Sequence, residues 1–327
     1  MSQSTPLDVH LQSLISGHPN RTALAQQVIP SLLQTLPSIA QALRSTSVSL
    51  AGNANHFGDD QLNVDVLAEN LIRDAIAKVP SITTASSEED PIEKPAYQGT
   101  QQSEEQYTIA FDPLDGSSII GPNWSVGTII GIWDGRSALS SSTPPRTSLV
   151  ASILGVLGPR TTAIVALRLP DTPGTAFEVR VSDDGAVDVV RPSVTLDSAP
   201  KTRYFAPANL RAAAEDPRYL ALVNHFVKQK YTLRYSGGLV PDVVHAFVKG
   251  HGVYMSPVTG QSPAKLRRLY EVAPVALVVE CAGGAALDAR DGSRVLDTAV
   301  RDTDERGGLV CGTAADVEFV RAGLLGQ

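Results

Sequence analysis

The chain has 327 residues, of which 43% are hydrophobic and 19% charged, a composition typical of a folded globular protein and not of a disordered one. Its formal net charge of −7 at pH 7 argues against nucleic acid or an anionic membrane as a partner. No apolar run reaches the roughly 18 residues that span a bilayer, and the first ten residues show no secretory or organellar signal, so we expect a cytoplasmic protein.

The first 191 residues are expected to form helices followed by strands. Apolar spacing predicts two helices within residues 1–45 and a third over residues 62–79, with Asp65 in its first turn. An acid at that position ordinarily just favours the helix dipole. Alternation and turn residues predict strands at 82–85, 107–111, 124–133, 151–157, 161–169, 177–181 and 187–190. This order is typical of a layered α+β fold and not of strict βαβ repeats.

A second unit is expected from residue 192 onward, which gives two domains, 1–191 and 192–327. It should contain a helix over 219–230 and a strand over 231–235. Two further helices are marked by a proline at the start and a glycine after the end, with Pro241 and Gly250 for one and Pro274 and Gly283 for the other.

Glu280 falls in the last turn of the helix that begins at Pro274. A carboxylate there opposes the helix dipole, which costs about 0.3–1 kcal/mol when the charge is unpaired. We therefore expect a positive group beside Glu280.

Residues 107–118, Tyr-Thr-Ile-Ala-Phe-Asp-Pro-Leu-Asp-Gly-Ser-Ser, change character halfway along. The first half reads as a strand that ends at Phe111, and the second half as a turn that aims Asp112 and Asp115 at one point. Carboxylates suit a divalent cation, and the small residues that follow offer backbone N–H groups to a phosphate. An Asp-rich turn without a ligand explains the same stretch about equally well.

Acids and cations gather at the ends of other predicted segments. The acids are Asp59, Asp65, Glu88, Glu89, Asp112, Asp115 and Glu280, and the cations of the second half are Arg234, Lys265 and Arg267. Runs of acids such as Glu88-Glu89-Asp90 usually lie on a solvated loop, but they can also form a cluster of metal ligands. Together these residues suggest metal-assisted transfer of a phosphoryl group to water.

Residues 111–118 are similar to the metal and phosphate motif of the fructose-1,6-bisphosphatase and sedoheptulose-1,7-bisphosphatase family. Further stretches match that family in order, namely Gly58-Asp59, residues 65–67, 87–89, 155–162 and 266–284. The resemblance covers most of residues 55–315. It implies an α+β fold of the layered α/β/α/β/α type with mixed sheets.

By position, the resemblance implies a role for each of these residues. Mg²⁺, or Mn²⁺ in its place, would be held as two to three ions per site by Asp59, Glu88, Asp112, the Leu114 carbonyl, Asp115 and Glu280. Asp65 and Glu89 would position and deprotonate the attacking water. The phosphate that is cleaved would be bound by Asp115, Gly116, Ser117 and Ser118. The distal phosphate and sugar would be bound by Asn209, Tyr235, Lys265 and Arg267, with Arg234 reaching into a neighbouring subunit of a homodimer or homotetramer.

Within the family, several stretches look closer to the sedoheptulose branch, among them Ser117-Ser-Ile-Ile120 and residues 231–242. The expected reaction is Mg²⁺-dependent hydrolysis of the 1-phosphate of sedoheptulose-1,7-bisphosphate, with fructose-1,6-bisphosphate as the second choice. A non-catalytic relative that binds sugar phosphates is the alternative from another class. Residues 46–58 contain no cysteine, and Cys281 and Cys311 lack the spacing of a metal or redox pair, so we expect no thiol switch.

Overall fold

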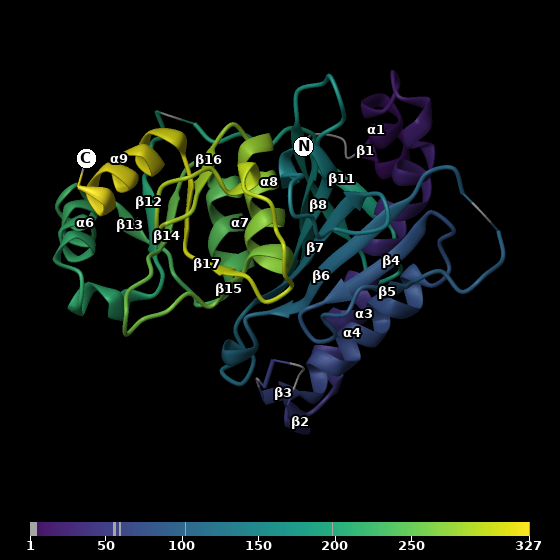
Figure 1. Cartoon of the computed structure of the whole chain (residues 1–327), viewed down its shortest axis with the longest axis horizontal. Helices are drawn as coiled ribbons and strands as arrows, with labels where there is room; N and C mark the ends of the chain where they lie inside the picture. Colours follow the sequence, from purple (N-terminus) through teal and green to yellow (C-terminus); the bar gives the residue numbers. More distant parts are fainter. Residues whose placement is uncertain (1–4, 55–56, 59, 102, 198, 327) are drawn as a thin grey trace.

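The computed structural model describes residues 5–54, 57–58, 60–101, 103–197 and 199–326. Figure 1 shows helices and sheets stacked as alternating layers along the longest axis of the molecule. The layers follow the order α/β/α/β/α, which confirms the predicted α+β fold with mixed sheets.

The larger sheet has nine strands in the order β1-β11-β10-β9-β8-β7-β6-β4-β5. All neighbouring strands are antiparallel except β4 and β6, which are parallel. The strands are β1 (Thr5–Pro6), β4 (Ile82–Ser87), β5 (Lys94–Pro95), β6 (Tyr107–Asp115), β7 (Val126–Asp134), β8 (Leu149–Leu157), β9 (Thr161–Leu167), β10 (Thr175–Val181) and β11 (Val187–Arg191). The predicted hairpins β8–β9 and β10–β11 are confirmed.

The N-terminal helices cover one face of this sheet. They are α1 (Leu7–Leu14), α2 (Ile29–Leu33), α3 (Thr35–Ser45) and α4 (Asn63–Ile76), with a 3₁₀ turn at Pro19–Arg21 and a π-helical turn at Leu24–Val28. Their apolar stripes and the facing side chains of the strands form one buried cluster, to which Leu32, Leu36 and Ile72 belong. A two-stranded pair, β2 (Leu50–Ala54) and β3 (Asp60–Leu62), precedes α4.

The middle layer consists of α7 (Leu239–Lys249) and α8 (Ala273–Cys281), which lie between the two sheets (Figure 1). Every residue of α8 from Ala273 to Val279 is buried. This helix is apolar all round because it packs on β8 and β9 on one side and on β16 and β18 on the other. A π-helical turn, Arg268–Val272, leads into α8.

The smaller sheet has five strands in the order β13-β12-β14-β18-β16, and α6 (Pro217–Lys228) and α9 (Ala314–Leu325) cover its outer face. Strand β12 is parallel to β13 and β14, whereas β18 is antiparallel to β14 and β16. The strands are β12 (Tyr204–Pro207), β13 (Thr232–Leu233), β14 (Val253–Ser256), β16 (Ala285–Leu287) and β18 (Leu309–Gly312).

The remaining elements are short. They are α5 (Pro145–Ser148), the pair β15 (Leu266–Arg267) and β17 (Arg306–Gly307), and 3₁₀ turns at Ser117–Ile119, Leu210–Ala214 and Val295–Asp297. The larger sheet comes from residues 5–191 and the smaller from residues 204–312, but one buried cluster joins both sheets through α7 and α8. The division into two domains at residue 191 stays a prediction. Within the part of the chain that the structure describes, no helix is both long and apolar enough to cross a membrane.

Strand β7 packs closely on α7 at Gly127, and this contact can be tested. Replacing Gly127 with alanine is expected to lower the free energy of unfolding by about 1–3 kcal/mol, because an added Cβ would lie 2.3 Å from the Cβ of Val240. Gly121→Ala is the matched control, since a Cβ there meets no heavy atom within 4 Å. Denaturant titration of both variants gives the comparison, and equal stability would contradict the close approach.

Candidate active site

Strand β6 carries both acids of the Asp-Pro-Leu-Asp stretch. It runs to Asp115, so the prediction that it ends at Phe111 is wrong. The ladder with β7 is irregular between Asp112 and Asp115, where one extra residue is accommodated. Pro113 has no N–H to donate there, and its carbonyl accepts a hydrogen bond of 3.0 Å from the Thr128 hydroxyl. The strand therefore bulges between the two acids, and the predicted turn after Phe111 is absent from this described stretch.

Three carboxylates converge beside this irregularity. Oxygen atoms of Glu88, Asp112 and Glu271 all lie within 4.8 Å of one another. Glu88 follows β4 and is placed by its own N–H, which donates to the Phe111 carbonyl at 3.0 Å. Glu271 comes from the π-helical turn before α8, so three separate segments build the group. We call these three residues the acidic group.

Burying the three carboxylates of the acidic group costs free energy unless a positive charge compensates them. Asp112 and Glu271 are each 6% exposed. Burial first, and then the charge of Glu88, raises the pKa of both carboxyls well above the ordinary range. A hard divalent cation among carboxylate oxygens would remove the repulsion, and oxygen is the ligand that such cations prefer. The residues present therefore fit a divalent metal.

Arg267 lies beside the acidic group. Its side chain is buried and forms an ion pair with Glu88. The central carbon of its guanidinium lies 4.0 Å from the centre of the Phe57 ring. Its backbone N–H donates to Glu271 at 2.5 Å. The position of Arg267 corrects the expectation that it lies with the distal phosphate, because its guanidinium is held against the acid that it neutralises.

Glu280 does not belong to the acidic group. Its carboxylate accepts hydrogen bonds from Arg146 at 2.9 Å and 3.1 Å and from Arg168 at 3.2 Å. The positive partner expected at the end of this helix is thus present. Glu280 follows Glu271 by nine residues, which along a helix is about 13 Å. The expectation that Glu280 joins the other acids is wrong, and Glu271 takes that place.

Asp65, Ser117 and Leu114 meet next to the acidic group. Asp65 is 2% exposed and accepts hydrogen bonds from the Leu62 N–H at 2.8 Å and the Ser117 hydroxyl at 3.2 Å. The Ser117 hydroxyl also lies 3.2 Å from the Leu114 carbonyl. Burial raises the pKa of the Asp65 carboxyl. Glu89 is half-buried and accepts a hydrogen bond from the Gln61 amide.

The loop after Asp115 approaches the second half of the chain closely. Gly116 has a φ of 92°, and a Cβ there would lie 3.3 Å from the Cα of Gly238, so glycine is needed for both conformation and space. Ser118, which belongs to the same loop, is exposed. Asp59 lies outside the described residues.

Asp115 joins β6 to the start of α7. Its carboxylate accepts hydrogen bonds from the N–H groups of Leu239 at 3.0 Å and Val240 at 2.7 Å. It therefore acts as a cap on α7 contributed by another segment, where a negative charge also suits the helix dipole. Burial raises the pKa of Asp115 to about 6. Its charge contributes to the raised pKa of Asp112, so it is within electrostatic reach of the acidic group.

The predicted distal residues lie around the carboxyl ends of β12, β13 and β14. Asn209 donates from its side-chain amide to the Pro257 carbonyl at 2.8 Å and the Ser262 carbonyl at 3.2 Å. Tyr235 is 44% exposed, and Lys265 is also exposed.

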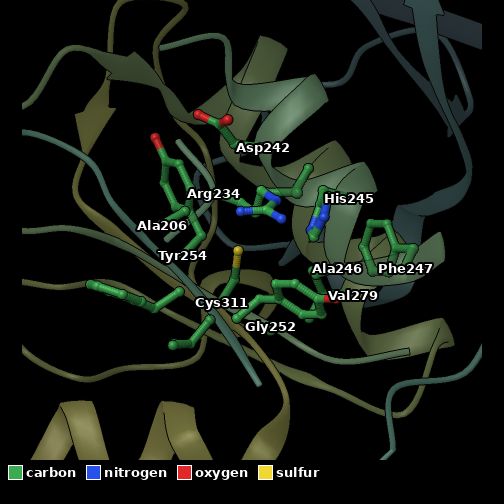
Figure 2. A pocket seen from close by; sticks show the side chains of 15 residues that line it. Ala206, Arg234, Asp242, His245, Ala246, Phe247, Gly252, Tyr254, Val279 and Cys311 are labelled. Atoms are coloured by element: carbon green, nitrogen blue, oxygen red, sulfur yellow. The ribbon is translucent and has the colours of Figure 1, made fainter. Parts of the chain in front are cut away.

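Arg234 turns toward its own chain. Figure 2 shows it in a pocket that Asp242, His245 and Tyr254 also line. Its guanidinium lies 5.7 Å from the ring centre of Tyr204 and donates to the Leu233 carbonyl at 2.8 Å. The expectation that it reaches a neighbouring subunit stays a prediction.

Glu271 is the member of the acidic group that the sequence reasoning missed. Its signal was present, since it lies in Tyr270-Glu-Val-Ala-Pro274 within the stretch already matched to the family. The prediction names Glu280, the acid after Pro274, and does not consider Glu271. The π-helical turn that precedes α8 points Glu271 to the sheet, and no sequence period indicates such a turn.

Comparison with known proteins agrees with this geometry. The family model for the N-terminal domain of fructose-1,6-bisphosphatase matches residues 15–176, and the model for the C-terminal domain matches residues 198–324. A chloroplastic sedoheptulose-1,7-bisphosphatase of Triticum aestivum is 39% identical over 284 residues, which is 87% of this chain and 69% of the relative. A class 1 fructose-1,6-bisphosphatase of Syntrophotalea carbinolica is 33% identical over 287 residues, which is 86% of this chain and 83% of the relative.

Solved structures give the same picture. The crystal structure of a Toxoplasma gondii protein assigned as a sedoheptulose-1,7 bisphosphatase superposes with a TM-score of 0.86 at 36% identity, over 98% of this chain and 99% of the other. Leishmania major fructose-1,6-bisphosphatase, at 24% identity and a TM-score of 0.82 over 99% of this chain and 100% of the other, shares the fold. The chain therefore belongs to the fructose-1,6-bisphosphatase family, in the group of sugar bisphosphatases that includes the sedoheptulose-1,7-bisphosphatases, and is a phosphoric monoester hydrolase.

Proposed function

We propose that this sugar bisphosphatase hydrolyses the 1-phosphate of sedoheptulose-1,7-bisphosphate in a Mg²⁺-dependent reaction that yields sedoheptulose 7-phosphate and phosphate. The observation that carries the reaction type is the acidic group, three carboxylates within 4.8 Å beside a glycine- and serine-containing loop. The choice of sugar is supported by the 39% identity to the wheat sedoheptulose enzyme, against 33% to the bacterial fructose enzyme. Fructose-1,6-bisphosphate is the second candidate substrate.

Glu88, Asp112 and Glu271 would hold Mg²⁺, or Mn²⁺ in its place. Asp115, the Leu114 carbonyl and Asp59 are proposed to complete a site for two to three ions. A bound divalent ion supplies polarisation of the phosphoryl oxygens and neutralises charge as it develops. Arg267 keeps the Glu88 carboxylate oriented through its ion pair.

Asp65 and Glu89 are proposed to orient and deprotonate the attacking water. Glu89 lies next to the acidic group in the chain, and Asp65 is linked to the neighbouring loop through Ser117; burial raises the pKa of Asp65, which favours its taking up a proton. The backbone N–H groups of Gly116, Ser117 and Ser118 would bind the phosphate that is cleaved. A Cβ added at Gly116 would lie 3.3 Å from the Cα of Gly238, so a side chain there would disturb this loop.

The remaining part of the substrate would lie along the carboxyl ends of β12, β13 and β14. Asn209, Tyr235 and Lys265 are proposed to hold the distal phosphate and sugar. A homodimer or homotetramer, in which Arg234 reaches a neighbouring site, is part of the same proposal. Cytoplasmic location stays a prediction, and the wheat relative is named as chloroplastic.

Phosphate release from the two bisphosphates, with and without Mg²⁺, tests the proposed reaction directly. The wild-type chain is expected to release phosphate only with Mg²⁺ and to show the higher kcat/KM for sedoheptulose-1,7-bisphosphate. Glu89→Gln should lower kcat about 10²–10⁴-fold, as expected for loss of a general base. Asp112→Asn should abolish the Mg²⁺-dependent rate. Lack of Mg²⁺-dependent release from any sugar bisphosphate would contradict the proposal, and a preference for fructose-1,6-bisphosphate would overturn the choice of sugar.

A matched pair of glutamate variants separates the acidic group from the ion pair at the end of α8. Glu271→Gln should remove most of the rise in melting temperature that Mg²⁺ produces in the wild type, because a ligand is lost. Glu280→Gln should keep that rise but lower the free energy of unfolding by about 1–3 kcal/mol, because Arg146 and Arg168 lose the carboxylate that they share. Thermal unfolding with and without Mg²⁺ measures both effects. The reverse pattern would return Glu280 to the metal site.

The stability that Mg²⁺ adds should increase with pH. Since the pKa of both Asp112 and Glu271 is raised in the folded chain, the metal-free folded state binds more protons than the unfolded state. The contribution of these two carboxyls to the free energy of unfolding is then fully present below their unfolded pKa of about 4 and is lost as the pH rises through their folded pKa. Mg²⁺ requires the ionised carboxylates, so its effect grows as those protons leave. Melting curves over about pH 5–8 test this, and a Mg²⁺ effect independent of pH would argue against it.

A further inference from the structure

The smaller sheet brings three segment ends to one edge. Strands β13, β12 and β14 are adjacent and parallel, so their carboxyl ends share an edge, the side on which open α/β sheets bind ligands. Asn209-Leu210-Arg211 follows β12, Arg234-Tyr235 follows β13, and the loop 257–265 follows β14. We call this the distal edge.

Hydrogen bonds connect the segments of the distal edge to one another. The Asn209 amide binds the carbonyls of Pro257 and Ser262. Glu215 binds the Ser262 hydroxyl at 2.6 Å, the Gln261 N–H at 3.2 Å and the Thr259 hydroxyl. Loop 257–265 is therefore hydrogen-bonded at several points, and the side chains of Asn209 and Glu215 are both engaged in these bonds.

Arg211 stands on this edge, where its charge, after the hydrogen bonds from Ser262 and Thr259, helps to lower the pKa of Glu215. It lies in the first turn of the 3₁₀ segment that begins after Asn209, whose φ of 48° redirects the chain there. Its side chain is exposed, and it donates no hydrogen bond and forms no ion pair with any residue that the structure describes. The pKa of Tyr235 is raised by burial and by Asp242, and the charge of Arg211 opposes that shift, so guanidinium and phenol are within electrostatic reach.

The distal edge is continuous with the loop that would bind the cleaved phosphate. Ser236, Gly237 and Gly238 follow Tyr235, and a Cβ added at Gly116 would lie 3.3 Å from the Cα of Gly238. A bisphosphate whose first phosphate lies at Gly116 thus has its chain directed along residues 235–238 to this edge.

We propose that Arg211 binds the phosphate of the substrate that is not cleaved and thereby sets the preference for bisphosphates over monophosphates. A guanidinium offers a planar fork of donors that matches phosphate oxygens two at a time. The inference rests on the proposed function for its substrate class. It adds a cation to the residues already proposed for the distal phosphate.

Arg211→Gln, Arg211→Lys and the control Arg290→Gln test it. Arg290 is also exposed, but it follows β16, which β18 separates from β14. With sedoheptulose-1,7-bisphosphate, Arg211→Gln should lower kcat/KM about tenfold or more, mainly through KM. With a ketose 1-phosphate that lacks the second phosphate, kcat/KM should not change. Arg211→Lys should be intermediate, and Arg290→Gln should match the wild type on both.

Binding of sedoheptulose 7-phosphate, followed by thermal shift, gives a readout without turnover. Arg211→Gln should weaken it about tenfold. A wild type that binds this ligand through Arg211 but cleaves no bisphosphate would refute the proposed function and leave the present inference standing. The inference is overturned if Arg211→Gln binds and cleaves like the wild type, if it loses bisphosphate and monophosphate activity equally, or if the wild type does not bind the ligand at all.

Discussion

The mutual repulsion of three carboxylates held within 4.8 Å governs this structure. Such a group is held only if rigid segments keep each acid in place and if either a cation compensates the charge or protonation removes it. Both conditions shape the fold. The β4–β6 ladder fixes Glu88 and Asp112, the packed helix α8 anchors Glu271, and Arg267 supplies one positive charge directly at Glu88. Arg267 compensates only part of the negative charge, and a divalent ion would neutralise the rest.

The middle helices give the site its second constraint. Helix α7 begins against Asp115, and the turn before it packs on Gly116, so the segment with the acids and the segment with Tyr235 share hydrogen bonds and contacts. Asp242 in the first turn of α7 accepts hydrogen bonds from the Ser236 and Gly237 N–H groups, at 2.6 Å and 3.2 Å. Two acids thus satisfy the backbone donors at one helix start. The geometry at the proposed phosphate loop and the geometry at the proposed sugar site are consequently set together.

Local patterns in the sequence account for much of this. Period, turn residues and charge predict three features. These are the hairpins β8–β9 and β10–β11, the helix marked by Pro241 and Gly250, and the acids of residues 111–118. The errors concern features without a local signature. Strand β6 runs past Phe111 because β7 pairs with it there, and Arg267 turns to Glu88 because of a contact between residues 179 positions apart. Glu271 depends on a π-helical turn that tertiary packing selects over a regular helix start.

The cap that Asp115 provides for α7 also bears on how the chain folds. The hydrogen-bonded groups are 124 and 125 positions apart in sequence, and closing a loop of that length precedes any gain from the contact. The larger sheet, built mostly from neighbouring hairpins, can form from local pairings before this happens. The active site is then among the last parts to assemble. A chain still being synthesised would hold its acids without their arginine and without α7 until the C-terminal residues emerge.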